Sequence, residues 1–304
     1  MPVHGRLDLR CAYGAPWRIA QNRAAAREIP YHVVLSGSAI LEDPAGGPSR
    51  RLAAGDILLI PDGEAHILHD GSGAPAVPAR DRLGHNLIIS ENSGPGDRLD
   101  MLCGHFALTT PQDRLLRDYL PSRLVVHGSN QGTSTEQSGS GAQLVGLVSL
   151  MRNEAAADSL GGRAMLNALS TALFALTLRL ASEATDAAAG LLALAGNPRL
   201  APALMAMFQE PARPWNLPEL ARLCHMSRAT AARQFQEKLG RSASDLLTDI
   251  RMTMAANELR KSSASTGAVA ETVGYQSEAA FQRIFKQRIG MTPARWRRAS
   301  RTLD

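Results

Sequence analysis

The feature that most constrains the fold is one spacing of residues that occurs twice near the C-terminus. The pattern Ser-x5-Arg-x-Phe runs from Ser227 to Phe235 and again from Ser277 to Phe285. Serine favours the N-cap of a helix, and the glycines at 240 and 290 suit the residue just after a helix end. A short apolar stretch at helical spacing precedes each serine by a few residues. A short helix, a tight turn and a second helix are therefore predicted twice.

The first unit has Pro218 in the first turn of a predicted helix whose apolar positions recur through Cys224. His225 follows in the turn, where glycine is common, and histidine tolerates the left-handed conformation better than most residues. The second unit has a short helix over 268–273 and a turn at Gly274. Residues 243–259 between them predict a long connecting helix. Such a helix would hold the two second helices about one DNA turn apart.

Charge supports a polyanionic partner for this part of the chain only. Residues 197–304 contain 17 Lys and Arg against 9 Asp and Glu, a net charge of +8. The remaining residues contain 16 against 19, a net charge of −3. A basic C-terminal region beside a mildly acidic remainder is typical of a chain that binds nucleic acid with one end.

The second helix of each unit offers candidate base-reading side chains. If Phe235 and Phe285 face the core, residues two and three positions earlier face outward, which selects Arg233, Arg283 and Gln282. Arginine can make a bidentate contact with guanine, and either arginine could instead contact a phosphate. Neighbouring side chains that could touch bases or phosphates are Arg228, Thr230, Gln234, Gln276, Glu278 and Lys286.

These residues carry a family resemblance. Residues 269–298, "VAETVGYQSEAAFQRIFKQRIGMTPARWRR", closely resemble the signature of the AraC/XylS family, and the segment beginning "WNLPELARLCHMSRAT" matches its first half. The resemblance implies a sequence-specific regulator of transcription that binds double-stranded DNA as a homodimer, acts with RNA polymerase and more commonly activates than represses. It implies no enzymatic activity.

The N-terminal part predicts a small antiparallel β-barrel followed by helices, so the whole chain is expected to be an α+β multidomain protein. Short β-rich runs cover 31–36, 39–42, 56–60, 66–69, 86–90 and 101–108, with turn residues between them. Gly55-x5-Pro61-x-Gly63-x2-His66 resembles the second cupin motif, whereas His32 is the main trace of the first. The segments "RCAYGAPW", "PYHVVLSGSA" and "LCGHF" resemble those of the cupin-type sensors in an AraC-type branch that includes oxidant-responsive members.

Two cysteines of this N-terminal part form a candidate redox switch. Cys11 and Cys103 both lie in the segments that carry the resemblance, whereas Cys224 occupies an apolar helical position. In a reducing cytoplasm such a pair is either inert or regulatory. Arg10 and His105 are close enough in sequence to lower the pKa of a thiol. Buried inert thiols and a signal that involves no cysteine remain open alternatives.

Histidines give the same domain a second candidate site. Cupin geometry could gather His32 and His66, with His69, His85 or Cys103, around a divalent metal. Structural histidines at strand ends are the alternative, and no cofactor is required by the sequence. A regulator that senses a metal or small ligand in the barrel is one alternative function. A cupin enzyme fused to a DNA-binding domain is a remoter one, because the His-x-His and Glu of a catalytic cupin are missing.

The predicted organisation is a sensor over 1–127, a flexible linker over 128–141, a helical region over 142–196 and a DNA-binding domain over 197–304. Leucines at 166, 169, 173, 176 and 180 form a stripe that could mediate dimerisation or merely pack on the barrel. Residues 166–181 are interrupted by polar side chains and are predicted not to span a membrane. With no apolar run in the first thirty residues, a cytoplasmic location is expected.

Overall fold

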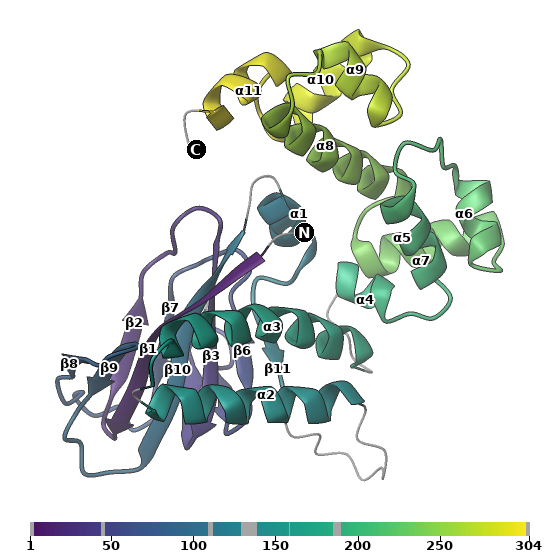
Figure 1. Cartoon of the computed structure of the whole chain (residues 1–304). Helices are drawn as coiled ribbons and strands as arrows, with labels where there is room; N and C mark the ends of the chain where they lie inside the picture. The colour runs from purple at the N-terminus through teal and green to yellow at the C-terminus, as the bar shows by residue number, and fades with distance from the viewer. Residues whose placement is uncertain are drawn as a thin grey trace. The chain divides into compact units, whose positions relative to one another are not determined.

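The computed structural model describes residues 3–43, 46–108, 112–128, 139–157, 159–184 and 190–301. The chain divides into two compact units. The first contains the β-strands with helices α2 and α3, and the second contains α1 and the helices from α4 onward. Figure 1 labels the helices and most of the strands.

Within the described residues, the strands of the first unit form two sheets. One has seven strands in the order β11-β6-β3-β10-β1-β9-β8, and the other has four in the order β2-β7-β4-β5. Pairing is antiparallel except between β1 and β9. The strands are β1 Val3–Gly14, β2 Arg18–Gln21, β3 Glu28–Ser36, β4 Ser38–Leu41, β5 Arg50–Ala53, β6 Ile57–Leu59, β7 His66–His69, β8 Arg80–Leu83, β9 Ile88–Glu91, β10 Arg98–Leu108 and β11 Leu124–Val126.

One hydrophobic core joins the two sheets. Val34 and Met101 come from the seven-stranded sheet, and Leu41 and Leu68 come from the four-stranded sheet. Side chains alternate between the two faces of a strand, so only every second residue of β3 and β10 reaches this core. The same core contains Cys11 and Cys103. The antiparallel-rich β-domain predicted from the sequence is confirmed.

Helices α2 (Gly139–Ala156) and α3 (Gly162–Glu183) belong to this unit, and α3 packs on β1. The backbone amide of Gly5 donates to Thr171 Oγ1 at 2.9 Å, and that of Leu7 donates to Asn167 Oδ1 at 3.2 Å. Among the described residues, α3 is the helix long and apolar enough to cross a membrane by length and composition. The polar side chains within α3 are therefore only a weak reason to exclude a membrane span. Two of them, Asn167 and Thr171, accept hydrogen bonds from backbone amides of β1.

The predicted leucine stripe on α3 divides between two environments. Leu166 and Leu173 are buried within the unit, whereas Leu169, Leu176 and Leu180 are half-buried. The first two leucines are buried within this unit, where α3 packs on both β1 and α2.

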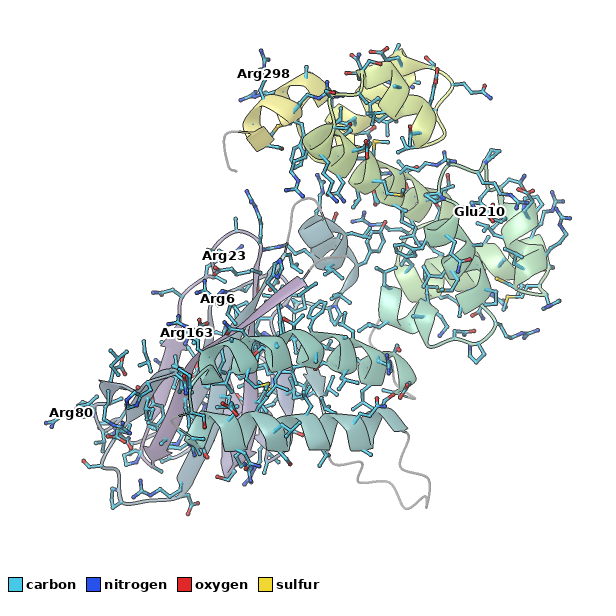
Figure 2. The ribbon with its side chains drawn as sticks, viewed as in Figure 1. Arg6, Arg23, Arg80, Arg163, Glu210 and Arg298 are labelled. Carbon is cyan, nitrogen blue, oxygen red and sulfur yellow. The ribbon has the colours of Figure 1, made fainter. Side chains whose placement is uncertain are left out.

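The second unit is helical. Its helices are α1 Gln112–Tyr119, α4 Leu191–Ala195, α5 Ala201–Gln209, α6 Leu217–Leu223, α7 Arg228–Leu239, α8 Ala243–Lys261, α9 Thr266–Thr272, α10 Glu278–Ile289 and α11 Pro293–Arg301. Figure 2 adds the side chains and labels Glu210 after α5, whose carbonyl accepts a hydrogen bond from Trp215 Nε1 at 2.9 Å. The all-helical C-terminal part predicted from the sequence is confirmed.

Several elements lie where the sequence indicated nothing regular. Strands β1, β2, β5, β8 and β11 were not predicted, nor was helix α1. Residues 129–138 of the predicted linker lie outside the described residues, and Gly139 already begins α2.

Candidate functional site

The first helix-turn-helix unit is α6 and α7. A capping box holds the start of α6, because the Asn216 side chain accepts from the Glu219 amide and the Glu219 side chain accepts from the Asn216 amide. His225 lies in the turn with φ 51°, the left-handed conformation anticipated there. Ser227 caps α7 by accepting from the Thr230 amide. This capping box could have been predicted from the Asn-x-x-Glu pattern of the sequence, but it was not.

The second unit, α9 and α10, repeats this construction. Ser277 caps α10 by accepting from the Ala280 amide, and Gly290 ends it with φ 86°. Gly274 in the turn has φ 83°, and a Cβ there would collide with the backbone of Ala212. Glycine is therefore required at this turn for both conformation and space.

Helix α8 joins the two units because it contributes to two separate hydrophobic cores. Leu246 and Ile250 pack in the core with Phe235 of α7. Met252 and Leu259, further along the helix, pack in the core with Phe285 of α10. Phe235 and Phe285 are completely buried, as the sequence predicted. A continuous helix shared by both cores makes the spacing of α7 and α10 rigid.

The predicted base readers lie on α7 and α10, except Gln276, which precedes the Ser277 cap of α10. Seven are exposed and two, Thr230 and Gln234, are half-buried. The exposed ones are Arg228, Arg233, Gln276, Glu278, Gln282, Arg283 and Lys286. Two side-chain contacts hold members of this surface in place: Arg233 Nε lies 3.6 Å from Glu237 Oε1, and Gln282 Nε2 donates to Glu278 Oε1 at 2.8 Å. Thr230 Oγ1 lies 2.9 Å from Ser227 Oγ and so belongs to the helix cap.

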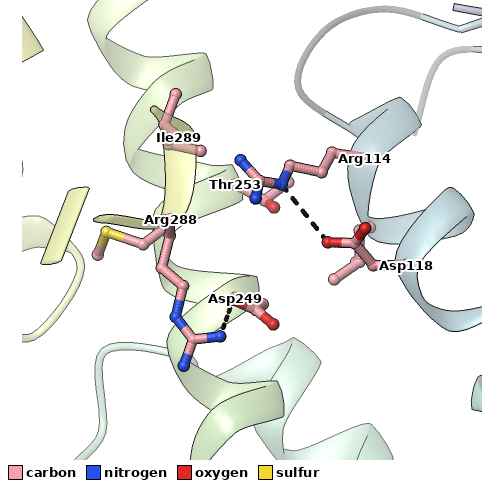
Figure 3. Close-up of a pocket in the computed structure, with 8 residues that line it drawn as sticks. Arg114, Asp118, Asp249, Thr253, Arg288 and Ile289 are labelled. Atoms are coloured by element: carbon pink, nitrogen blue, oxygen red, sulfur yellow. Dashed lines mark hydrogen bonds and ion pairs between the residues drawn. The ribbon is translucent and has the colours of Figure 1, made fainter. Parts of the chain in front are cut away.

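Helix α1, which the sequence did not predict, packs on α8 within the second unit. The Tyr119 hydroxyl donates to Asp249 Oδ2 at 2.5 Å. Arg288 of α10 lies 3.2 Å from the other Asp249 oxygen, so one carboxylate ties α1 to α8 and α10. Figure 3 shows the crevice at this junction, with the Arg114–Asp118 pair of α1 on one side. A segment between β10 and β11 is thereby built into the helical unit.

The sensor half contains a second candidate site in the core between the sheets. Cys11 of β1 and Cys103 of β10 are free thiols with their Sγ atoms 3.7 Å apart. Both are nearly inaccessible, with 2% and 3% of their surface exposed. Neighbouring antiparallel strands bring them together, since Cys11 pairs with Met101 and Cys103 pairs with Leu9.

Two histidines extend this thiol pair. Cys103 is directly opposite His32 of β3, and His32 Nδ1 lies 3.2 Å from Cys103 Sγ. The other nitrogen of that ring, Nε2, lies 2.7 Å from Nε2 of His66, which begins β7 in the other sheet. His66 Nδ1 lies 3.0 Å from the carbonyl oxygen of Glu64. Both rings are buried. We call Cys11, Cys103, His32 and His66 the thiol–imidazole chain.

Burial dominates the electrostatics of this chain. Burial, together with the neighbouring His66, lowers the pKa of His32 to about 3, so its ring is neutral at physiological pH. Burial also lowers the pKa of His66. The contact with the Cys11 thiol, and then burial, raise the pKa of Cys103 well above its ordinary value. Cys103 is therefore a protonated thiol at rest.

Arg10 and His105 do not lie beside the thiols as expected. Arg10 makes a bidentate pair with Asp100, in which Nε donates to Oδ1 at 2.8 Å and Nη2 donates to Oδ2 at 2.7 Å. His105 Nδ1 lies 2.6 Å from Asp8 Oδ2. Arg10 precedes Cys11 in a strand, and adjacent side chains point to opposite faces. The base nearest to Cys103 is instead His32, which the sequence had linked to a metal.

Two of the three proposed metal ligands, His32 and His66, lie together, whereas the contacts of His69 lie elsewhere. His32 and His66 are hydrogen-bonded to each other, and His69 accepts from the Gly71 amide at 2.9 Å. In the part of the chain that the structure describes, no three His, Cys, Asp or Glu side chains are grouped to hold a metal. We therefore assign no metal to these histidines.

Comparisons with known proteins support the domain type assigned to each half of the chain. Residues 1–183 match a family model described as Cupin, and residues 220–299 match one described as Helix-turn-helix domain. The chain is 30% identical to an "Uncharacterized HTH-type transcriptional regulator" of Haemophilus influenzae, covering 98% of this chain and 95% of the relative. It is 30% identical to a "Putative AraC-like transcription regulator" of Streptomyces antibioticus, covering 98% and 95%.

A third relative is the "RCS-specific HTH-type transcriptional activator RclR" of Escherichia coli, which is 26% identical with 98% of this chain and 94% of the relative covered. The two matched domains, in this order, span most of the chain. This chain belongs to the AraC-type family of DNA-binding transcription regulators that carry an N-terminal cupin domain.

Proposed function

We propose that this regulator senses oxidants by forming a disulfide between Cys11 and Cys103. The observation that carries the proposal is the 3.7 Å separation of two buried free thiols on neighbouring strands. A disulfide needs about 2.05 Å between the sulfurs, so a shift of under about 2 Å closes the bond. The name of the relative RclR, an RCS-specific activator, supports the same class of signal.

The DNA-reading surface is the exposed face of α7 and α10, with Arg233 and Arg283 as the guanine readers. Both arginines are exposed and are held at corresponding positions of two rigidly linked helices. Arginine at a recognition helix gives the commonest specific contact in the major groove. We expect this binding to take place in the cytoplasm and to activate transcription with RNA polymerase. Two relatives are named as transcriptional activators, which supports activation.

The regulator acts as a homodimer, and a second copy covers the apolar outer surface of α2 and α3. Val145 and Leu150 of α2 and Met165 of α3 are more than half exposed. A dimer doubles the length of DNA that is read. Light scattering of the full chain tests this: Leu150→Glu is expected to give monomers, and an unchanged mass would exclude this surface.

A reporter placed behind the regulator's own promoter tests the redox proposal in cells exposed to sublethal hypochlorite. Cys11→Ser and Cys103→Ser are each expected to abolish the response. Cys224→Ser is the matched control, because Cys224 is also a buried free thiol but lies in the helical unit. A full response from either of the first two variants would refute the proposed switch.

A further inference from the structure

The direction of every hydrogen bond in the thiol–imidazole chain follows from its last member. The Glu64 carbonyl can only accept, so His66 Nδ1 must carry the proton of that 3.0 Å contact. In a neutral ring Nε2 of His66 is then a bare acceptor. Only one proton fits between two nitrogens 2.7 Å apart, so that proton belongs to His32 Nε2.

The position of the His32 proton in turn determines which thiol is the donor in each remaining hydrogen bond. With its proton on Nε2, neutral His32 has a bare Nδ1, which accepts the S–H of Cys103 at 3.2 Å. Cys103 has no second proton to give, so Cys11 is the donor in the 3.7 Å contact between the sulfurs. The two thiols are therefore not equivalent, because only Cys103 donates to a base.

We propose that His32 and His66 form a proton relay that removes the proton of Cys103 as an oxidant attacks it, and that Cys11 is the resolving thiol. This inference rests on the proposed function, and it assigns separate roles to the two cysteines. The geometry that carries it is an unbroken chain of donors and acceptors across three strands of one sheet and into the other.

The chemistry balances with a two-electron oxidant such as hydrogen peroxide. Cys103 Sγ attacks one peroxide oxygen, the O–O bond breaks, and the thiol proton passes to His32 Nδ1 while the Nε2 proton of His32 passes to His66. The departing hydroxide recovers a proton from His66 through the same chain, giving Cys103 sulfenic acid and water. Cys11 Sγ then attacks the sulfenic sulfur, and its own proton leaves with the hydroxyl as a second water. Each oxidation of two thiols thus consumes one peroxide.

A base is needed because the resting thiol is protonated. The pKa of Cys103 is raised by the Cys11 contact and by burial, so unaided ionisation near neutral pH is rare. Two charged groups outside the thiol–imidazole chain act on His66. The charge of Asp62 raises the pKa of His66, and the charge of Arg123 lowers it. Burial keeps the pKa of both histidines below the ordinary value, so the relay is unprotonated and ready at neutral pH.

The test is the rate of Cys11–Cys103 disulfide formation in the full-length protein with dilute hydrogen peroxide, between pH 6 and 9. His32→Asn keeps an acceptor near the Nδ1 position but no base, and His66→Gln keeps an acceptor for the His32 proton. His69→Gln is the matched control, because His69 lies on the same strand as His66 but outside the chain. Near-UV circular dichroism verifies the fold of each variant.

The wild type and His69→Gln are expected to react at a nearly constant rate from pH 7 to 9, because burial keeps both histidines unprotonated there. His32→Asn is expected to react about 10²-fold more slowly at pH 7, with a rate that rises tenfold per pH unit. His66→Gln should also be slower, because His32 must then hold the proton itself. A purely structural histidine would leave the slope of the pH profile unchanged.

Sulfenic acid trapping with dimedone tests the assignment of the cysteines independently of any histidine variant. Peroxide is expected to modify Cys103 in Cys11→Ser at least tenfold faster than Cys11 in Cys103→Ser. Equal rates, or a wild-type pH profile in His32→Asn, would overturn the relay while leaving the disulfide switch intact. A reporter response that survives Cys103→Ser would instead remove the proposed function itself.

Discussion

Oxidation should stabilise the N-terminal unit, because the disulfide closes a long loop within it. Cys11 and Cys103 are 92 residues apart in sequence and lie on neighbouring strands near the centre of the larger sheet. Cross-linking them removes conformational freedom mainly from the unfolded chain. For a loop of this length the chain-entropy estimate is about 4.6 kcal/mol at 25 °C.

Part of this gain is offset in the folded state. Disulfide formation removes the S–H that Cys103 donates to His32, and Nδ1 of that buried ring is left without its donor. An unsatisfied buried acceptor costs about 1–3 kcal/mol. The net stabilisation expected is about 1.6–3.6 kcal/mol. For a domain of about 150–250 residues this raises the melting temperature by about 3–14 °C.

Differential scanning calorimetry of the reduced and peroxide-oxidised full chain measures this shift, with the disulfide verified by mass spectrometry. Cys11→Ser treated with the same oxidant is the control, and its melting temperature should not rise. An oxidised wild type that contains the disulfide but melts at the same or a lower temperature would refute the reasoning. That result would mean that closing the bond strains the sheet by more than the loop entropy provides.

Three further predictions follow from other contacts. Arg283→Ala should weaken binding to a specific DNA site by about 1–3 kcal/mol and relax specificity at one base pair. Fluorescence anisotropy on matched and base-substituted duplexes measures both effects. Equal weakening on random DNA would assign Arg283 to a phosphate contact. Tyr119→Phe removes the donor to Asp249 and should destabilise the helical unit by about 1.5 kcal/mol in urea unfolding, and no change would mean that α1 docks without this bond. Because the pKa of buried His32 is lowered to about 3, unfolding exposes a ring that binds a proton below pH 6.5. The stability of the N-terminal unit should therefore fall by about 1–2 kcal/mol between pH 7 and pH 5, and His32→Asn should show a smaller loss.

The helix-turn-helix units could be predicted because their determinants are local. Ser227 and Ser277 cap the helices that follow them, and His225 and Gly274 adopt left-handed conformations in the turns. Each of these signals acts within a few residues of sequence. Helix α1 was missed because its anchor, Tyr119, contacts Asp249, which is 130 residues away. A contact of that kind leaves no local pattern.

The residues of the sensor site could be predicted from the sequence, but their arrangement could not, because it depends on contacts between residues distant in sequence. The sequence singled out Cys11, Cys103, His32 and His66, but it divided them between a redox pair and a metal site. Strand register decides otherwise, since Cys103 lies directly opposite His32 in the β3–β10 pair. The expected roles of Arg10 and His105 were wrong, because each is paired with an aspartate. In β1, Arg10 and Cys11 are adjacent, so their side chains point to opposite faces of the strand.

The most direct measurement of the redox switch is binding of the purified full-length protein to the promoter region beside its own gene, at one fixed salt concentration, before and after peroxide treatment. We predict specific binding that changes on oxidation, returns after reductant and is insensitive to peroxide in Cys103→Ser. Specific binding that is identical in the reduced and disulfide-containing protein would contradict the switch and leave a DNA-binding regulator with a different signal.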